Sequence, residues 1–204
     1  MSRTPGAKAG LSRERVLSAA LALVDRDGLK ALSMRRLGAE LGVEAMSLYH
    51  HVPTKDALLD GLVELVLRHC EPPAFDGAWR STLAAYAHSL RATLLAHPEL
   101  LPLIASRPAV TPDTLRPVEQ GVRMLVDAGF PLGHALDALN TLSIFAIGHA
   151  TSEVAIGPDS PTPDLTAFPL LATAARSGQG TDDEARFHFA VEALLTGLEA
   201  VALA

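Results

Sequence analysis

Along most of the chain, hydrophobic residues recur every three or four positions, the spacing of α-helices with one buried face. In the first part of the chain the pattern predicts helices over residues 12–28, 33–42 and 45–51, and a fourth helix that begins after Thr54. Ser12, Ser33 and Thr54 are suitable N-caps for three of them. Gly28 and Gly42 suit the C-terminal ends, where a left-handed residue is common.

The pattern continues in the second part of the chain, where Pro and Gly again separate the segments. It predicts helices over residues 79–97, 100–106, 132–153 and 165–176, a helix that ends at Gly129, and a last helix opened by the capping-box pattern Thr181–Glu184. Pro112 and Pro117 both suit a first turn and should not both lie inside the helix before Gly129, so we expect its start near Pro117. Strand-like alternation is absent from the sequence, and we predict an all-α fold.

The composition supports packed helices. Apolar residues make up 49% of the 204 residues and aromatic residues only 4%, so Leu, Ala and Val must form most of the interior. The single cysteine, Cys70, excludes an intramolecular disulfide and is typical of a reducing cytoplasm. The longest uncharged apolar stretch, between Asp137 and Glu153, is too short to span a membrane. We therefore expect a soluble, cytoplasmic protein without a membrane partner.

The net charge of −6 conceals an uneven distribution. Residues 1–55 contain nine Lys and Arg against five Asp and Glu, whereas the rest of the chain contains eight against eighteen. A basic beginning on an acidic body suggests that the first part meets a polyanion, although solvated surface charge gives the same imbalance. We divide the chain into a flexible basic arm (1–11), a first domain (12–56) and a second domain (57–204), with the boundary inside the fourth helix.

The second and third predicted helices form a helix-turn-helix. A tight turn with Gly42 joins them, and Leu37, Leu41, Val43 and Leu48 are apolar anchors. The second helix of such a pair can enter the major groove of DNA. A structural helical hairpin has the same apolar pattern, so spacing alone leaves both interpretations open.

The exposed residues of this hairpin suit DNA. Arg35 can pair bidentately with guanine, and Ala45, Met46 and Tyr49 can contact thymine methyl groups. Phosphates are better matched by Ser47, His51 and Lys55, together with the backbone amides that follow Thr54. The predicted DNA-binding residues are Ser33, Arg35, Arg36, Glu44, Ala45, Met46, Ser47, Tyr49, His50, His51 and Lys55.

Three runs of sequence resemble the DNA-binding domain of the tetracycline-repressor (TetR) family of regulators. They are SMRRLGAELGV at residues 33–43, SLYHHV at residues 47–52 and KDALL at residues 55–59. The resemblance implies that Arg35 reads a base and that the side chains of Ala45, Met46 and Tyr49 face bases. It places Ser47, His50, His51 and Lys55 near the DNA backbone.

A weaker likeness to the tetracycline-repressor subgroup covers nearly all of the remaining chain. It rests on Trp79, Arg91–Ala92, Leu94–Leu95, His97, Arg107–Pro108, Gly129–Phe130, Phe145 and Gly148. That subgroup binds a magnesium-chelated drug, but here Leu103 aligns with its metal-ligating His, and Tyr86, Leu90 and Gly121 align with its drug-contacting Asn, Phe and Gln. Leucine offers no ligand to a divalent ion, so we predict no metal site, no cofactor and no tetracycline binding.

The second domain should hold the site of an unknown small-molecule effector. The expected ligand-binding residues are Tyr86, Leu90, Leu103, Ser106, Arg107, Pro108 and His149, which would form a mostly apolar pocket with a few orienting polar groups. Arg107 could pair with an anionic ligand or cap a helix end. Tyr86 and Leu90 have the spacing of ordinary core residues as well.

Two helices of the second domain carry a heptad rhythm typical of helix-helix seams. The seam positions are Leu132, Leu136, Leu139, Ser143, Ala146 and Ala150 in one helix and Phe187, Val191, Leu194, Leu198 and Val201 in the other. Residues 132–153 and 184–203 would then join two copies of the chain in a four-helix interface, unless the seams pack within one subunit. A homodimer would present two recognition helices about 34 Å apart, the spacing of a palindromic site.

We expect a ligand-responsive transcriptional regulator of the repressor type, which binds a palindromic double-stranded operator as a homodimer and is released by a small-molecule effector. The alternative is a helical module that binds a small molecule or a protein without specific operator binding. The sequence has no G-x-S-x-G element, no Gly-rich phosphate loop after a strand, and no H-x-x-x-H or C-x-x-C spacing, so we do not expect an enzyme.

Overall fold

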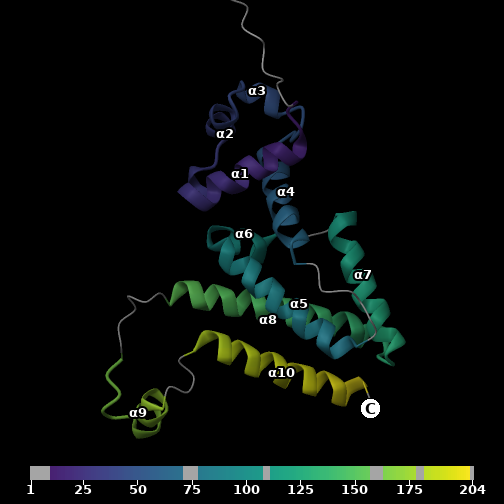
Figure 1. Cartoon of the computed structure of the whole chain (residues 1–204), viewed down its shortest axis with the longest axis vertical. Helices are drawn as coiled ribbons and strands as arrows, with labels where there is room; N and C mark the ends of the chain where they lie inside the picture. The colour runs from purple at the N-terminus through teal and green to yellow at the C-terminus, as the bar shows by residue number, and fades with distance from the viewer. Residues whose placement is uncertain (1–9, 71–77, 108–110, 157–162, 178–181, 203–204) are drawn as a thin grey trace, which may run out of the picture. The chain divides into compact units, whose positions relative to one another are not determined.

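The structure, a computed structural model, describes residues 10–70, 78–107, 111–156, 163–177 and 182–202 (Figure 1). These residues form α-helices and two short 3-10 helices and contain no strand, which confirms the all-α fold. The elements are α1 (Arg13–Asp27), η1 (Leu29–Ala31), α2 (Met34–Leu41), α3 (Ala45–Leu48), α4 (Lys55–Arg68), α5 (Trp79–Ala96), η2 (Pro98–Leu100), α6 (Leu101–Ser106), α7 (Pro112–Asp127), α8 (Leu132–Ala155), α9 (Pro169–Arg176) and α10 (Asp183–Ala202). Most of the predicted arm, together with Pro108 and Thr181, lies outside the described residues.

The described chain forms two compact units. The N-terminal unit extends to Leu65 and the C-terminal unit begins at Val66, so α4 has residues in both. The structural boundary therefore lies in the predicted helix but further along it than the expected boundary after residue 56.

Side-chain and glycine caps fix the helix ends of the N-terminal unit. Ser12 and Ser33 each accept a hydrogen bond at 3.2 Å, from the backbone N–H of Arg15 and Arg36, as predicted. Gly42 ends α2 in the left-handed region with φ 66°. Gly38 is also required, because a Cβ there would lie 2.9 Å from the Val43 carbonyl oxygen in the turn before α3.

The third helix is shorter than expected. It ends at Leu48, and residues 49–51 continue as turns rather than as helix. The N–H groups of His51 and Val52 both donate to the Leu48 carbonyl at 2.9 Å, which closes the turn. Pro53 prevents continuation into α4, because a residue before proline is driven out of the helical region.

The core of the C-terminal unit lies between α5 and α8, and α10 runs alongside α8 (Figure 1). Ala135, Ala138, Ala146 and Ala150 of α8 are fully buried. Because alanine has a small side chain, these positions allow the neighbouring helices to approach closely.

Two expected helix starts in this unit are wrong. α7 begins at Pro112 rather than near Pro117, because the backbone N–H of Thr111 donates to the Thr114 hydroxyl at 3.1 Å and caps the helix there. Pro117 lies inside α7 and removes one backbone hydrogen bond without ending the helix. α9 begins at Pro169 rather than at residue 165, since proline suits the first helical position.

The last helix, α10, begins within the predicted pattern Thr181–Glu184. The carboxylate of Asp182 accepts hydrogen bonds from the N–H groups of Glu184 and Ala185 at 2.9 and 3.3 Å. Asp182 is therefore the N-cap of the helix.

The predicted seam residues of α8 and α10 do not lie on one exposed face. Ala146, Ala150, Phe187 and Val191 are fully buried within the unit. The heptad rhythm at these positions marks the intramolecular packing face, because a helix that packs inside its own subunit shows the same period. Three other predicted seam residues, Leu132, Leu136 and Val201, are exposed, as are Ile144 and Phe189 of the same helices.

Candidate functional site

The helix-turn-helix presents large apolar side chains on its surface. Met46 of α3 is 74% exposed and Tyr49, which follows the helix, is 40% exposed, while Leu48 between them is fully buried. Leu48 thus anchors the short helix, and Met46 and Tyr49 remain free to contact another molecule.

Arg35 and Arg36 are adjacent on α2, but they have different surroundings. The Arg36 guanidinium donates to the Asp27 carboxylate at 2.6 Å, which ties α2 to α1. Among the residues that the structure describes, Arg35 has no hydrogen-bond or ion-pair partner and is exposed. Arg35 is therefore available to a partner molecule, whereas Arg36 is engaged inside the unit.

A second ion pair reinforces the contact between α1 and α2. Arg26 donates to both carboxylate oxygens of Glu40 at 3.1 Å and to Asp27 at 3.0 Å. The hydrogen bonds from Arg26 hold the pKa of Glu40 below its ordinary value. Both groups are exposed, so the pair fixes geometry more than it adds stability.

The other predicted DNA-binding residues lie before α2 and along the turn-α3-turn segment. Ser33 is exposed and caps α2. Glu44, His50 and Lys55 are exposed, while Ala45, Ser47 and His51 are half-buried. Thr54 accepts from the Ala57 N–H at 2.9 Å and so caps the start of α4, beside Lys55.

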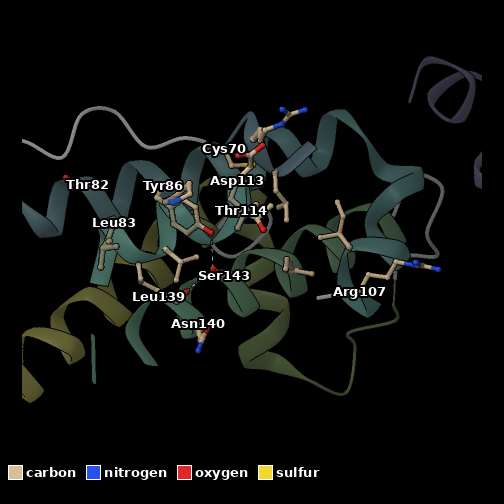
Figure 2. Close-up of a pocket in the computed structure, with 18 residues that line it drawn as sticks. Cys70, Thr82, Leu83, Tyr86, Arg107, Asp113, Thr114, Leu139, Asn140 and Ser143 are labelled. Atoms are coloured by element: carbon tan, nitrogen blue, oxygen red, sulfur yellow. Dashed lines mark hydrogen bonds between the residues drawn. The ribbon is translucent and has the colours of Figure 1, made fainter. Parts of the chain in front are cut away.

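The C-terminal unit contains a cavity of about 310 Å³. Most of its walls come from one face each of α5, α7 and α8, and the end of α4 and α6 complete it (Figure 2). Its lining residues are Leu67, Arg68, Cys70, Thr82, Leu83, Tyr86, Leu90, Ile104, Arg107, Asp113, Thr114, Pro117, Val118, Gly121, Leu139, Asn140, Ser143 and Ile147. The volume falls at the lower end of the range for drug-sized ligands.

Three of the predicted ligand-binding residues, Tyr86, Leu90 and Arg107, line this cavity. Leu103 is buried outside it, and Ser106 is exposed with its hydroxyl donating to the Pro102 carbonyl at 2.7 Å. Pro108 is outside the described residues. Leu103 and Ser106 therefore do not line the cavity beside Arg107.

The remaining predicted residue, His149, belongs to a cluster between α5, α8 and α10. Its Nδ1 atom is buried and lies 3.6 Å from the Glu153 carboxylate, and its ring packs edge-on against Phe187. The Arg91 guanidinium donates to the same carboxylate at 3.0 and 2.8 Å and covers the Phe187 ring. Burial lowers the pKa of His149, against the opposing effect of Glu153. His149 is thus a core residue and does not line the cavity.

Ser143, which the sequence analysis assigned to a dimer seam, is a central polar group of the cavity. The Tyr86 and Ser143 hydroxyl oxygens lie 3.0 Å apart, and Ser143 donates to the Leu139 carbonyl at 2.9 Å (Figure 2). Burial raises the pKa of Tyr86 above its ordinary value. The i, i+4 spacing of Leu139, Ser143 and Ile147 places them on one face of α8. The spacing alone does not tell whether that face borders a cavity or another helix.

Gly121 of α7 lies in the cavity wall, where α7 packs closely on α8. A Cβ at this position would meet the Leu139 side chain at 3.1 and 3.2 Å. The missing side chain therefore lets α7 approach α8 beside the cavity.

Among the described residues, no group of three or more His, Cys, Asp or Glu side chains could hold a metal ion. We also find no helix in the described residues that is long and apolar enough to cross a membrane.

A helix-turn-helix and a cavity-bearing helical unit in one chain are the organisation of a ligand-responsive transcriptional repressor. The chain matches the family described as bacterial regulatory proteins, tetR family, over residues 16–62 and the tetracyclin repressor-like C-terminal domain over residues 71–202. The protein belongs to the TetR family of transcriptional regulators.

Curated and solved relatives agree with this assignment. The HTH-type transcriptional repressor DrrR1 of Streptomyces coeruleorubidus is 32% identical over 215 residues, covering 95% of this chain and 79% of the relative. The tetracycline repressor protein class D of Escherichia coli is 36% identical over 200 residues, covering 94% and 90%. The Streptomyces coelicolor protein ActR, solved in complex with actinorhodin, has a TM-score of 0.81 and 30% identity, covering 95% of this chain and 99% of that one.

Proposed function

We propose that the protein binds a palindromic operator as a homodimer and is released from it by a small molecule in the cavity of the C-terminal unit. The observation that carries the proposal is the surface of the helix-turn-helix, where Met46 and Tyr49 are exposed around a buried Leu48 and Arg35 has no partner among the described residues. Exposed apolar groups beside an unengaged guanidinium suit the edges of bases in a major groove.

In the proposed complex, Arg35 pairs with a guanine, and Ala45, Met46 and Tyr49 contact thymine methyl groups. Ser47, His50, His51 and Lys55 lie near phosphates, together with the amides after Thr54. Ser33, Arg36 and Glu44 complete the predicted set, and the Asp27 ion pair gives Arg36 a positioning role for α2.

A second copy of the chain covers the exposed apolar residues of α8 and α10. Ile144 is 71% exposed and Phe189 is 76% exposed, values that are costly for a surface in water. Gly148 and Gly197 have open space around them, so a partner helix can come close there. The proposed interface keeps the predicted segments 132–153 and 184–203 and uses their exposed residues, which include the predicted Leu132, Leu136 and Val201.

Release follows from linkage between ligand and operator. Leu67 and Arg68, in the last turn of α4, line the cavity, and earlier residues of α4 belong to the N-terminal unit. A ligand that favours one placement of this turn lowers operator affinity by its differential affinity for the two states. The effector acts without magnesium, and a regulator of this kind acts in the cytoplasm.

Titration of the protein against its own upstream DNA, followed by fluorescence anisotropy at several salt concentrations, tests the proposal. Specific binding should exceed binding to scrambled DNA and weaken steeply with salt, with two chains per operator in sedimentation. Equal affinity for both DNAs would favour the alternative, a helical binding module without specific operator recognition.

A further inference from the structure

The hydroxyl pair at the centre of the cavity has one hydrogen-bond arrangement that satisfies both of its contacts. Ser143 has a single hydroxyl proton, and its oxygen lies 2.9 Å from the Leu139 carbonyl, which can only accept. Its proton therefore goes to Leu139, because otherwise two acceptors would face each other at this distance. The proton in the 3.0 Å contact with Tyr86 must then come from Tyr86.

Two other groups in the wall also use their hydrogens on the protein. The Thr114 hydroxyl donates to the Thr111 carbonyl at 3.0 Å, and the Cys70 thiol contacts the Val66 carbonyl at 3.7 Å. Figure 2 shows the Arg107 guanidinium and the Asn140 amide pointing away from the Tyr86 hydroxyl. The oxygen of Tyr86 thus retains lone pairs but has no hydrogen to offer.

Leucine side chains lie beside Tyr86, while the charged side chains of the wall are Arg68, Arg107 and Asp113. Leu83 and Leu90, on the same helix as Tyr86, are buried, and Leu139 lies opposite them in the wall. A charged group placed among these side chains would lose its hydration without a compensating ion pair. The part of a ligand that reaches the hydroxyl pair must therefore be neutral.

We propose that the cavity selects a compound with a hydroxyl group on a neutral, apolar part, and that this hydroxyl donates to the Tyr86 oxygen. The proposal rests on the proposed function, since it assigns a chemical class to the effector of the same cavity. A ligand that offers only a carbonyl is disfavoured, because it would place an acceptor against the committed Tyr86 oxygen.

Calorimetric titration of the full chain with 2-naphthol and with 2-acetylnaphthalene tests the hydrogen-bond direction. The two probes share a ring system, but only 2-naphthol can donate. We expect 2-naphthol to bind about five- to tenfold more tightly. Absence of 2-naphthol binding, or equal or tighter binding of 2-acetylnaphthalene, would overturn the proposal.

Two substitutions sharpen the test. Ser143→Ala removes the acceptor of the Tyr86 proton and frees the O–H as a donor, so the preference should shift toward 2-acetylnaphthalene. Ser106→Ala is the matched control, because Ser106 also donates to a carbonyl four residues earlier but lies outside the cavity. If Ser143→Ala leaves the ratio of the two probe affinities unchanged, the assigned direction of the Tyr86–Ser143 hydrogen bond is wrong. Operator titration of the same samples separates this failure from failure of DNA binding.

Discussion

The Arg91 guanidinium donates two hydrogen bonds to the Glu153 carboxylate and thereby joins α5 to α8, with only 13% and 19% of the two side chains exposed. Such a pair contributes little net stability when intact, since both charges lose hydration. Its loss on one side is costly, because the remaining charge is left buried.

Glu153→Gln should therefore lower the free energy of unfolding by about 3 kcal/mol. Urea denaturation followed by circular dichroism measures the change. Glu119→Gln is the control, because its ion pair with Arg123 is about 70% exposed and should contribute less than about 1 kcal/mol. Similar losses in both variants would show that the Arg91 pair is no different from a surface pair.

Stability should decline in mild acid through His149. Burial lowers the pKa of His149 in the folded protein, so the unfolded chain binds a proton more readily. The contribution of neutral His149 is complete above about pH 6.5 and is lost as the pH falls toward its folded pKa. The free energy of unfolding can be measured with urea at about pH 7.5 and at about pH 5.5. It should differ less between the two conditions for His149→Gln than for the unchanged protein.

His88 contributes to the same pH dependence, because burial lowers its pKa too. The expected effect of His149→Gln is therefore partial. His69→Gln, at an exposed histidine, serves as the control. A pH dependence unchanged by His149→Gln would exclude His149 as its source.

Arg35→Ala and Arg36→Ala should differ in operator binding although the residues are adjacent. Loss of a bidentate contact to guanine costs about 1–3 kcal/mol and relaxes specificity at one base pair. Arg36→Ala removes the ion pair with Asp27 and should act mainly on the contact between α1 and α2. Anisotropy titrations against operator variants distinguish the two, and a uniform loss across all base substitutions in Arg35→Ala would argue against base reading.

Replacement of operator thymines by uracils tests Met46 and Tyr49 without any change in the protein. Uracil lacks the methyl group, so affinity should fall at the contacted positions and remain the same elsewhere. Met46→Ala should make binding insensitive to the same replacement at its own position. Persistent sensitivity in that variant would assign the methyl contact to another residue.

Phe189→Glu should separate the two copies of the chain without unfolding either. Phe189 is 76% exposed, so a carboxylate is tolerated in the monomer but not against a second apolar helix. Sedimentation velocity measures the change, with Val126→Glu on α7 as the control at another exposed apolar residue. A dimer that survives Phe189→Glu would place the interface elsewhere.

Local chemistry made part of this structure predictable. Ser12, Ser33 and Gly42 fix helix ends through their own hydrogen bonds and backbone preference, and these ends were predicted. The start of α7 was not, because the Thr111–Thr114 cap outweighs the single hydrogen bond that Pro117 removes. The sequence permits both starts of this helix, and the energy difference that decides between them cannot be derived from residue spacing.

The cavity was only partly predictable for a different reason. Tyr86 and Leu90 were found through resemblance to relatives, whereas Ser143 was assigned to a seam. Helical period identifies which residues share a face, but the partner of that face depends on packing between segments distant in the sequence.

Gly121 has a consequence for how this regulator could acquire new inducers. The Leu139 side chain packs directly against residue 121 because that residue has no side chain, so any Cβ placed there would push Leu139 aside in the cavity wall. A single codon change at this position can therefore alter which molecules the cavity binds, while the residues proposed to contact bases remain the same.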